Sequence, residues 1–326
     1  MAQPQLSVIM AHLNEGDEPL ATAKSALETS PPDFVEVVAI DDCSDQGKYA
    51  DLGGIRGVRA FRNQRRLGLF TTKDFAIGHA RADNLMVIDA HMRFKHDGWA
   101  ERMVGALSAE PETVFCTTCL GLGWRGGKGN EPLIPPDMAK PNGRYYGATL
   151  VIRGERDTSQ GRRMHWLEPR WQGRQSADAE YELPCVLGAN YGVRKDWWLR
   201  IGGLRGLRAW GGQEACLSLK TWLSGGRCKI LTDIEIGHIF RSAAPYPASH
   251  AAIWHNRMRI ALTLLPEPYS ERIYREIAGK YPAGAKLVEE DRRQVTSERA
   301  AFMRIHRPGS LEALVERFKL QMEWEK

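Results

Sequence analysis

Short apolar runs alternate with segments of helical periodicity over residues 6–88, and this alternation constrains the fold more than any other feature. The apolar runs are Leu6–Ala11, Val35–Ile40, Val58–Phe61 and Asn84–Ile88. The segments of helical periodicity are Glu18–Thr29 and Thr71–Arg81. Strands separated by helices form parallel sheets with helices on their faces. We therefore expect an α/β fold with a Rossmann-like, mostly parallel central sheet flanked by helices.

Polar residues follow three of these apolar runs directly. His12 and Asn14 follow the first run, Asp41-Asp42 follows the second, and Asp89 follows the fourth. The carboxyl ends of parallel strands share one edge of a sheet, and ligands of open α/β folds bind in the crevice at that edge. The sequence therefore predicts a ligand site there.

The composition is that of a folded globular enzyme. The 326 residues are 43% hydrophobic and 26% charged, which excludes a disordered chain, a collagen-like fibre and a disulfide-stapled miniprotein. A net charge of +5 does not identify a nucleic-acid-binding protein. The six cysteines lie in apolar or strand-like runs, so we expect buried free thiols, although Cys116 and Cys119 have the spacing of half a zinc site.

The sequence carries no membrane or export signal that we can identify. Its first residues lack a cationic segment followed by a long apolar core, and no later run reaches about 18 apolar residues. We therefore expect no signal peptide, no membrane span and a location in a bacterial or viral-host cytoplasm.

Residues 120–175 are rich in Gly, Pro and Arg and show little periodicity. They include ten basic and five acidic residues, so their net charge equals that of the whole chain. Long segments without regular structure are usually functional or mobile. We therefore expect a basic, mobile insert here.

Asp89 and His91 form a candidate metal motif after the fourth apolar run. Residues two apart in an extended segment point the same way, so the two side chains can converge on one ion. Oxygen and nitrogen donors together suit Mn²⁺ or a similar divalent ion held on a diphosphate. A third ligand is needed, and His238, after the apolar run Lys229–Ile236, is the candidate. The alternatives are a turn cap or surface pair at Asp89 and His91, and a hydrogen-bonded core histidine at His238.

Three more motifs suit a nucleotide-like ligand. Asp41-Asp42 can bind a ribose or a base, or cap the following turn. Trp210-Gly211-Gly212-Gln213-Glu214 opens a helical segment, and its glycines and free N–H groups allow close approach of an anionic or polar ligand. The alternative is a tight turn with Glu214 on the helix dipole. Arg241 and Tyr246 follow His238 and suit closure over a diphosphate.

In this order, the motifs resemble the catalytic domain of the polypeptide N-acetylgalactosaminyltransferases, which belong to the family-2-like glycosyltransferases with the GT-A fold. The similar segments are Ser7–Gly16, Val37–Asp45, Arg62–Leu69, Val87–Arg93, Trp210–Gly226 and Gly237–Tyr246. The resemblance implies a GT-A catalytic domain over residues 1–250, with residues 120–175 on its acceptor side. Residues 251–326, mostly amphipathic helix, form a helical C-terminal extension in this scheme.

The resemblance also implies a retaining enzyme that uses a UDP-sugar and Mn²⁺. The implied metal ligands are Asp89, His91 and His238. The implied donor-binding residues are His12, Asn14, Glu15, Asp41, Asp42, Arg66, Gly68, Lys73, Asn190 and Tyr246. The implied catalytic residues on the sugar and acceptor side are Trp210, Gln213, Glu214 and Arg241.

The chain departs from the family pattern at several positions. Gln213 stands where the family has Glu after WGG, and the acid moves to Glu214. The usual basic residue after Gly-Leu is Thr71 here, with Lys73 two positions later. The family's two glycines before an apolar run appear as Gly188-Ala189-Asn190. We expect neither the membrane anchor nor the lectin domain of the animal enzymes.

The sequence thus predicts a metal-dependent hexosyltransferase that moves a sugar from a UDP-GalNAc-, UDP-GlcNAc- or UDP-Glc-like donor to an acceptor hydroxyl with retention. Inversion follows instead if Glu214 reaches that hydroxyl as a general base. The acceptor is a protein Ser/Thr or a hydroxymethylated base in phage-type DNA bound through residues 120–175. The alternatives are a sugar-nucleotide-forming nucleotidyltransferase, disfavoured because His12–Gly16 replaces its Gly-rich basic loop, and a noncatalytic nucleic-acid-binding protein.

Overall fold

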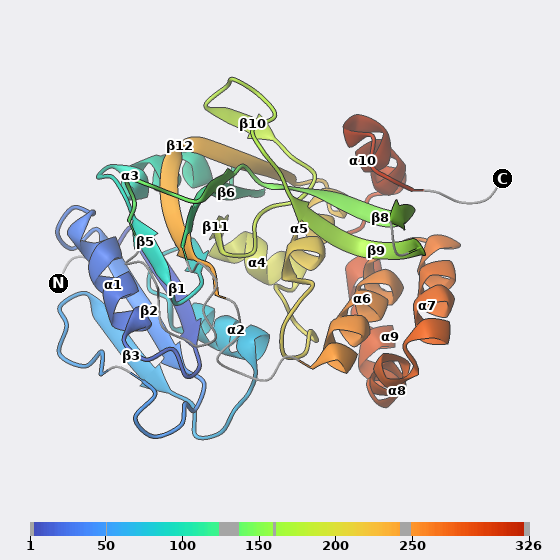
Figure 1. Ribbon diagram of the computed structural model, residues 1–326, viewed down its shortest axis with the longest axis horizontal. Helices are drawn as coiled ribbons and strands as arrows, with labels where there is room; N and C mark the ends of the chain where they lie inside the picture. The colour runs from blue at the N-terminus through green and yellow to red at the C-terminus, as the bar shows by residue number, and fades with distance from the viewer. Residues whose placement is uncertain (1–2, 50, 124–136, 159–160, 242–248, 323–326) are drawn as a thin grey trace.

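A ten-stranded sheet forms the centre of the molecule in the computed structural model (Figure 1). The structure describes residues 3–49, 51–123, 137–158, 161–241 and 249–322, without the side chains of residues 155–158 and 161–164. The strand order is β10-β12-β6-β11-β4-β1-β2-β3, with β5 beside β12 and β7 beside β6.

The N-terminal part of the sheet is parallel. Its strands are β1 (Leu6–His12), β2 (Val35–Asp41), β3 (Val58–Arg62) and β4 (Asn84–Ile88). Hydrogen bonding joins β1 in parallel to both β2 and β4, and β2 in parallel to β3. Every residue of β1, β2 and β4 is buried, because helices cover both faces. The parallel α/β core predicted from the alternating sequence is confirmed.

The rest of the sheet mixes directions. Its strands are β5 (Met92–Phe94), β6 (Thr113–Leu122), β7 (Gly143–Tyr145), β10 (Glu180–Glu182), β11 (Asn190–Arg194) and β12 (Arg227–Ile239). Strand β11 enters antiparallel between β4 and β6, whereas β12 lies parallel to β6. Strand β5 pairs antiparallel with β12, which brings the segment after β4 next to the end of β12.

Helices cover the two faces of the sheet in separate layers. The layer helices are α1 (Glu18–Glu28), α2 (Leu69–His79), α3 (Trp99–Ala109), α4 (Lys195–Ile201) and α5 (Gln213–Leu223). Along β1, Val8 and Met10 pack in the core cluster that includes α1 and α3. Ile9 between them packs in the cluster that includes α2, α4 and α5. Alternate residues of a strand therefore build two cores.

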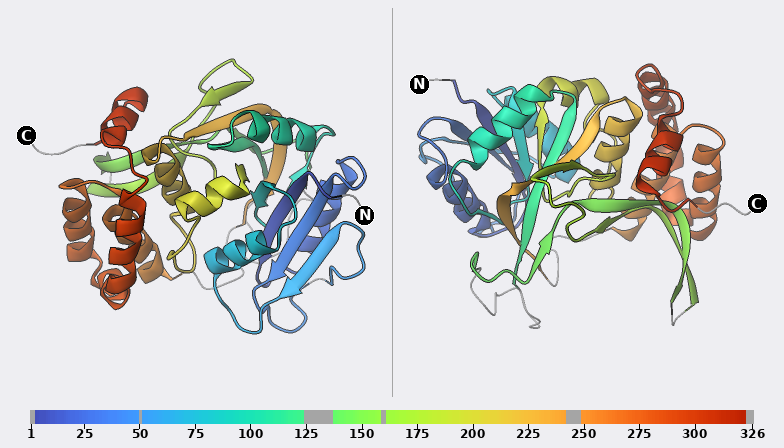
Figure 2. Two further views of the ribbon diagram at one scale, coloured as in Figure 1. Left: turned by 180° about the vertical axis from the view of Figure 1, so that it is seen from behind. Right: turned by 90° about the horizontal axis from the view of Figure 1, so that it is seen from above.

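The C-terminal part of the chain is helical and packs beside the sheet (Figure 2). Its helices are α6 (His250–Leu264), α7 (Tyr269–Lys280), α8 (Pro282–Glu290), α9 (Arg292–Met303) and α10 (Ser310–Phe318). Trp254, Met258 and Phe302 belong to the same hydrophobic cluster as Ile9, so these helices share a core with the sheet. Within the described ranges, none of the helices combines the length and the apolar character needed to span a membrane.

Within the described part of residues 120–175, regular strands replace the irregular segment that the sequence predicts. Strand β8 (Ala148–Thr158) pairs with β9 (Gly161–Trp171) in a separate two-stranded sheet that extends towards α7 and α10 (Figure 1). Leu150, Ile152 and Trp166 are buried in the core shared with the C-terminal helices. The many Arg and Gly residues obscured this short apolar pattern, which is why composition alone suggested irregular structure. Residues 124–136 of the stretch lie outside the described part.

Candidate functional site

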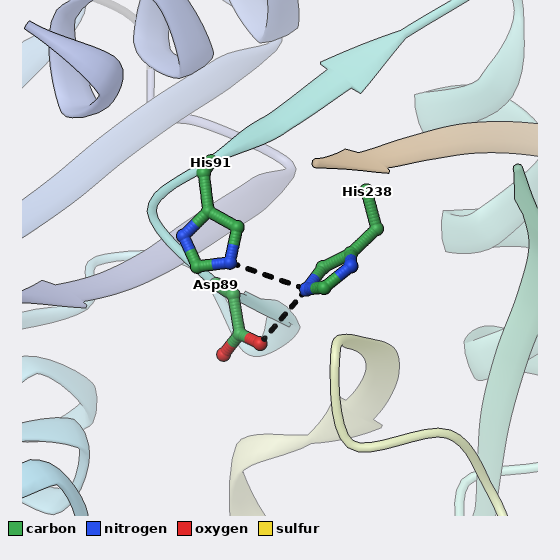
Figure 3. Close-up of side chains that lie close together, drawn as sticks. All are labelled: Asp89, His91 and His238. Carbon is green, nitrogen blue, oxygen red and sulfur yellow. Dashed lines mark hydrogen bonds and ion pairs between the residues drawn. The ribbon is translucent and has the colours of Figure 1, made fainter. Parts of the chain in front are cut away.

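Asp89, His91 and His238 come together at the carboxyl edge of the sheet (Figure 3). Asp89 follows β4, and His91 precedes β5. His238 lies in β12 opposite Met92 of β5, so strand pairing places the two imidazoles side by side. Their Nε2 atoms are 3.2 Å apart, and Oδ2 of Asp89 is 3.7 Å from Nε2 of His238. One potential ligand atom from each residue lies within 4.8 Å of the others.

The protonation states of these side chains fit a divalent cation. Burial lowers the pKa of His238, which keeps its ring neutral and leaves a nitrogen lone pair available. Burial alone would raise the pKa of Asp89, but Lys73, His238 and His91 hold it well below its usual range. Metal ligands must be in these deprotonated forms. One carboxylate oxygen and two imidazole nitrogens form a donor set suited to Mn²⁺ and related divalent ions.

Lys73 connects the metal motif to the start of α5. Its side chain is fully buried, and its Nζ lies 3.3 Å from Oδ1 of Asp89 and 3.2 Å from Oε1 of Gln213. The amide of Gln213 donates to the carbonyl of Gly188 at 3.2 Å. A buried ammonium needs such partners because an isolated charge is costly away from water. Lys73 therefore fixes Asp89 and Gln213 relative to each other.

Glu15 contacts both His91 and Arg241 at the edge of the site. Its Oε2 lies 3.4 Å from Nδ1 of His91 and forms an ion pair with Arg241. Burial would raise the pKa of Glu15, but His91 and Arg241 together lower it. A carboxylate facing Nδ1 orients the imidazole and leaves Nε2 free for a metal. Glu15 thus supports His91 rather than joining the cluster itself.

The two acids at the end of β2 are occupied by contacts within the protein. Asp42 accepts hydrogen bonds from the backbone N–H groups of Leu67 at 2.7 Å and Gly68 at 2.8 Å. Asp41 accepts from the N–H of Ser44 at 3.0 Å and forms an ion pair with Arg62. The contact of Asp41 with Ser44 fits the turn-capping interpretation, whereas Asp42 binds the segment directly before α2.

The remaining predicted nucleotide residues surround this turn. The amide oxygen of Asn14 accepts from the N–H of Asp45 at 2.8 Å, and Arg66 pairs with the carboxylate of Asp45 at 2.6 Å. The side chain of Arg66 is 45% exposed, so it lies on the rim. His12 is buried, with Nδ1 3.8 Å from Oδ1 of Asp41.

Glu214 and Trp171 form the side of the site next to α5. Burial raises the pKa of Glu214, the nearby Asp89 raises it further, and a hydrogen bond from Trp171 opposes the rise. A Cβ atom at Gly188 would lie 2.6 Å from the amide nitrogen of Gln213 and 2.8 Å from the carboxyl carbon of Glu214. Only glycine therefore leaves both side chains in place. Trp171 was not among the predicted residues, since no motif marks it.

Two predicted residues stand apart from the cluster, and a third is not described. Asn190 is fully buried, and its side chain accepts a hydrogen bond from Oγ1 of Thr117 at 2.8 Å. Only the backbone next to it reaches the metal motif, since the carbonyl of Ala189 accepts from the N–H of Asp89. Trp210 is 47% exposed beside the α5 N-terminus. Tyr246 lies outside the described residues.

Comparison with known proteins identifies a family. The family model described as Glycosyl transferase family 2 matches residues 7–198, more than half of the chain. The chain is 28% identical over 283 residues to polypeptide N-acetylgalactosaminyltransferase 10 of Homo sapiens, covering 83% of this chain and 43% of the relative. It is 27% identical over 254 residues to putative polypeptide N-acetylgalactosaminyltransferase 13 of Drosophila melanogaster, covering 73% and 42%. The chain thus spans less than half the length of these curated relatives.

Solved structures share the fold. A crystal structure of GalNAc-T7 with UDP, GalNAc and Mn²⁺ superposes with a TM-score of 0.62 at 20% identity, covering 91% of this chain and 58% of that one. A crystal structure of S. aureus TarS 1-349 in complex with UDP-GlcNAc gives a TM-score of 0.51 at 16% identity, covering 95% and 83%. At these identities the likeness supports the GT-A fold.

Proposed function

The chain belongs to glycosyl transferase family 2, and from this premise we propose that it is a divalent-cation-dependent transferase that moves a sugar from a UDP-sugar to an acceptor hydroxyl. The observation that carries the proposal is the convergence of Asp89, His91 and His238 at the carboxyl edge of the sheet. The donors named in the structural neighbours, UDP with GalNAc and UDP-GlcNAc, give the donor class to test first.

Asp89, His91 and His238 would hold the cation through one oxygen and two nitrogens. A bound divalent cation such as Mn²⁺ neutralises the charge that develops on a leaving diphosphate. Arg241, fixed by Glu15, lies next to this cluster and would add positive charge on the same side. Tyr246, five positions later, is proposed to close over the donor with it. Arg66 and Asn14, which both contact Asp45 in the turn after β2, would contact the nucleotide.

Gln213 and Glu214 would face the donor sugar. Gln213 is held by Lys73 and by the carbonyl of Gly188, so its orientation is fixed before any ligand arrives. The raised pKa of Glu214 favours its protonated form, which suits hydrogen-bond donation to the sugar better than general-base catalysis. We therefore propose retention, and the anomeric proton coupling in the NMR spectrum of the product distinguishes it from inversion.

We propose a protein Ser/Thr hydroxyl as the acceptor. The curated relatives are named for polypeptide glycosylation. Two arginines of the basic stretch are neutralised by acids, since Arg144 pairs with Glu235 and Arg153 with Glu276. Paired arginines contribute less to binding a polyanion such as DNA than free ones.

A donor screen with Mn²⁺ tests the proposal, with released UDP as the readout for each UDP-sugar. A Ser/Thr-containing peptide should stimulate release, and the same peptide with alanine at those positions should not. EDTA should abolish release. Stimulation by hydroxymethylated DNA alone would identify the other acceptor, and release of pyrophosphate from a nucleoside triphosphate would identify a nucleotidyltransferase instead.

A further inference from the structure

We propose that Asn256, in α6 of the C-terminal helices, is a positioning residue that holds the Trp210–Gln213 turn in place for sugar transfer. Its side chain is fully buried. Its amide oxygen accepts from the N–H of Arg208 at 2.8 Å, and its amide nitrogen donates to the carbonyls of Arg208 and Gly211, both at 2.8 Å. The inference rests on the proposed function, because it assigns the turn to the sugar side of the site.

The turn needs an external anchor because its own backbone is not regular. Ala209 has φ of +50°, and Gly211 and Gly212 have φ of +93° and +87°. A left-handed conformation is unfavourable for alanine, and glycine gains the most conformational freedom when it is released. The three hydrogen bonds from Asn256 pair backbone groups at both ends of this irregular segment.

One face of α6 is shaped to receive the turn. Ile253, Asn256 and Ile260 lie at helical spacing on this face. A Cβ atom at Gly211 would lie 3.3 Å from the side chain of Ile253, and one at Gly212 would lie 3.3 Å from Ile260. The backbone of the turn therefore packs directly on the helix, with Asn256 as the polar contact between two apolar ones.

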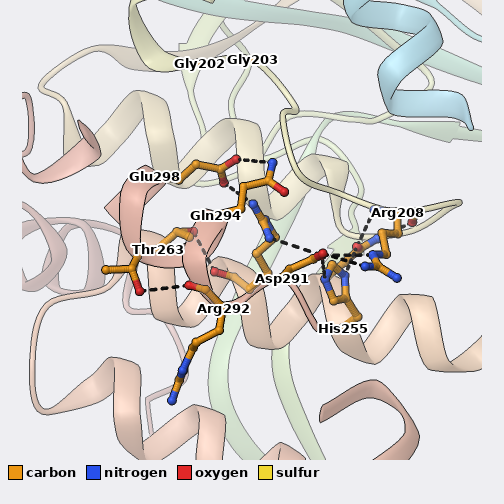
Figure 4. Close-up of polar contacts among 12 residues, drawn as sticks. Gly202, Gly203, Arg208, His255, Thr263, Asp291, Arg292, Gln294 and Glu298 are labelled. Atoms are coloured by element: carbon orange, nitrogen blue, oxygen red, sulfur yellow. Dashed lines mark hydrogen bonds and ion pairs between the residues drawn. The ribbon is translucent and has the colours of Figure 1, made fainter. Parts of the chain in front are cut away.

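A second set of contacts holds the same segment through the side chain of Arg208. Arg208 donates to both oxygens of Asp291, at 2.7 and 3.1 Å, and His255 of α6 lies 3.0 Å from the same carboxylate (Figure 4). Asp291 directly precedes α9. Arg208 is thus bound through its backbone by α6 and through its guanidinium next to α9.

The anchored turn leads directly into the site. Gln213 begins α5 immediately after Gly212, and its side chain contacts Lys73, which in turn contacts Asp89. A displacement of the turn would therefore move Gln213 while leaving the metal ligands in place, after β4, before β5 and in β12. A misplacement of about 1 Å at a reacting group can cost about 10²-fold in rate.

Three variants test the proposal, with Arg299→Ala as the matched control. Asn256→Ala removes the three hydrogen bonds to the turn, and with them the 3.0 Å contact of its amide oxygen with Nδ1 of His255. Asn256→Asp keeps the side-chain volume and the oxygen that accepts from the N–H of Arg208. It replaces the donating NH₂ group by a carboxylate oxygen, which repels the carbonyls of Arg208 and Gly211. Asp291→Asn leaves the hydrogen bonds between Asn256 and the turn in place. It weakens the side-chain contacts of Arg208, together with the contacts of the same carboxylate with His255 and Arg259. Arg299 also donates two hydrogen bonds to backbone carbonyls in this region, those of Leu262 and Leu265, but does not contact the turn.

We expect both Asn256 variants to remain folded, to bind UDP with Mn²⁺ within about 2-fold of wild type, and to lose about 10- to 100-fold in kcat/KM for sugar transfer. Amide hydrogen exchange should rise in peptides covering residues 207–215 and stay unchanged around residues 84–94. Asp291→Asn should show a smaller change in the same direction, and Arg299→Ala none.

Asn256→Asp with wild-type transfer and wild-type exchange at residues 207–215 would overturn the proposal, because packing alone would then suffice. If the Asn256 variants do not fold, hydrogen exchange of the wild-type protein decides, because Asn256 is the acceptor for the N–H of Arg208. An Arg208 amide without protection from exchange would refute the anchoring. A wild-type protein that transfers no sugar from any donor would refute the proposed function instead, and the exchange data would still decide whether Asn256 anchors the turn.

Discussion

The ammonium of Lys73 lies 3.3 Å from Oδ1 of Asp89, and the other carboxylate oxygen of Asp89, Oδ2, is the one nearest His238. The two oxygens therefore have different neighbours before any ligand binds. We expect Asp89 to bind a cation through Oδ2 while Oδ1 stays with Lys73. The same contact orders the metal site and connects it to Gln213.

Replacing Lys73 should make the fold depend on the metal. Lys73→Met leaves the Asp89 carboxylate without its cationic partner. Lys73 is fully buried but Asp89 is partly exposed, so we expect a loss of about 2–3 kcal/mol in the free energy of unfolding, less than for a fully buried ion pair. Mn²⁺ supplies the missing positive charge, so it should raise the Tm of the variant more than that of wild type. Thermal unfolding with and without Mn²⁺ measures this. An equal Mn²⁺ effect on both proteins would contradict the assignment of Asp89 as a ligand.

A methyl group at Gly188 should damage transfer more than stability. The Cβ of Gly188→Ala would displace the ends of the Gln213 and Glu214 side chains, which can move, so we expect a loss of about 1 kcal/mol in stability. Sugar transfer should fall at least about 10-fold, since both side chains are proposed to face the sugar. UDP binding with Mn²⁺ should be retained.

Gly105→Ala is the matched control for this substitution. Gly105 lies in α3, and a Cβ atom there would meet no neighbouring atom within 4 Å. Alanine should therefore raise the free energy of unfolding by about 0.5–1 kcal/mol and leave transfer unchanged. Equal rates of sugar transfer by Gly188→Ala and Gly105→Ala would show that the clash at Gly188 does not affect the site.

Much of the central sheet follows from local sequence pattern. The apolar run Leu6–Ala11 predicted β1 to within one residue, because every position of that strand is buried and apolar side chains reveal it. The helix expected from Trp210 begins only at Gln213, since Gly211 and Gly212 adopt positive φ before it.

The site could be predicted only in part, because its contacts join distant segments. The motif at Asp89 and His91 is local, and the structure places His238 beside it through the pairing of β5 with β12. Trp171 and Asn256 carry no local signal, since each acquires its role from a chain segment far away in sequence. The capping of Leu67 and Gly68 by Asp42 is likewise a contact that spacing cannot distinguish from ligand binding.

The carboxylate of Asp74 should make stability fall as pH rises. Burial raises the pKa of Asp74, and the hydrogen bond from the Trp198 indole at 2.9 Å opposes this. The folded state therefore holds the proton more tightly than the unfolded state, so stability is lost as pH rises through the unfolded pKa towards the folded one. Asp74→Asn keeps an acceptor for Trp198 without the charge. Relative to wild type, it should gain more in free energy of unfolding at pH 7.5 than at pH 4.5.

Urea unfolding at the two pH values measures that difference, with Asp83→Asn as the control because the Asp83 side chain is 74% exposed. The control should change little at either pH. A variant of Asp74 that is less stable than wild type by the same amount at both pH values would show that its charge carries no cost in the fold.

Removing the charge of Glu15 should weaken metal binding without removing a ligand. Glu15→Gln loses the ion pair with Arg241 and the carboxylate that faces Nδ1 of His91. Residues that orient a metal ligand typically contribute about 10- to 100-fold in affinity, and we expect a loss in this range for Mn²⁺. Glu18→Gln, which breaks a comparable pair with Arg93, should leave the affinity unchanged. Equal affinities of the two variants would remove Glu15 from the site.

Titration of the protein with Mn²⁺ in the presence of UDP, followed by calorimetry, tests the central claim most directly. We expect one site per chain in wild type and in His96→Ala, whose side chain is 58% exposed and outside the cluster. Asp89→Asn, His91→Ala and His238→Ala should each bind at least about 100-fold more weakly while remaining folded. Wild-type affinity in all three variants would contradict the account, because these residues could not then share one cation.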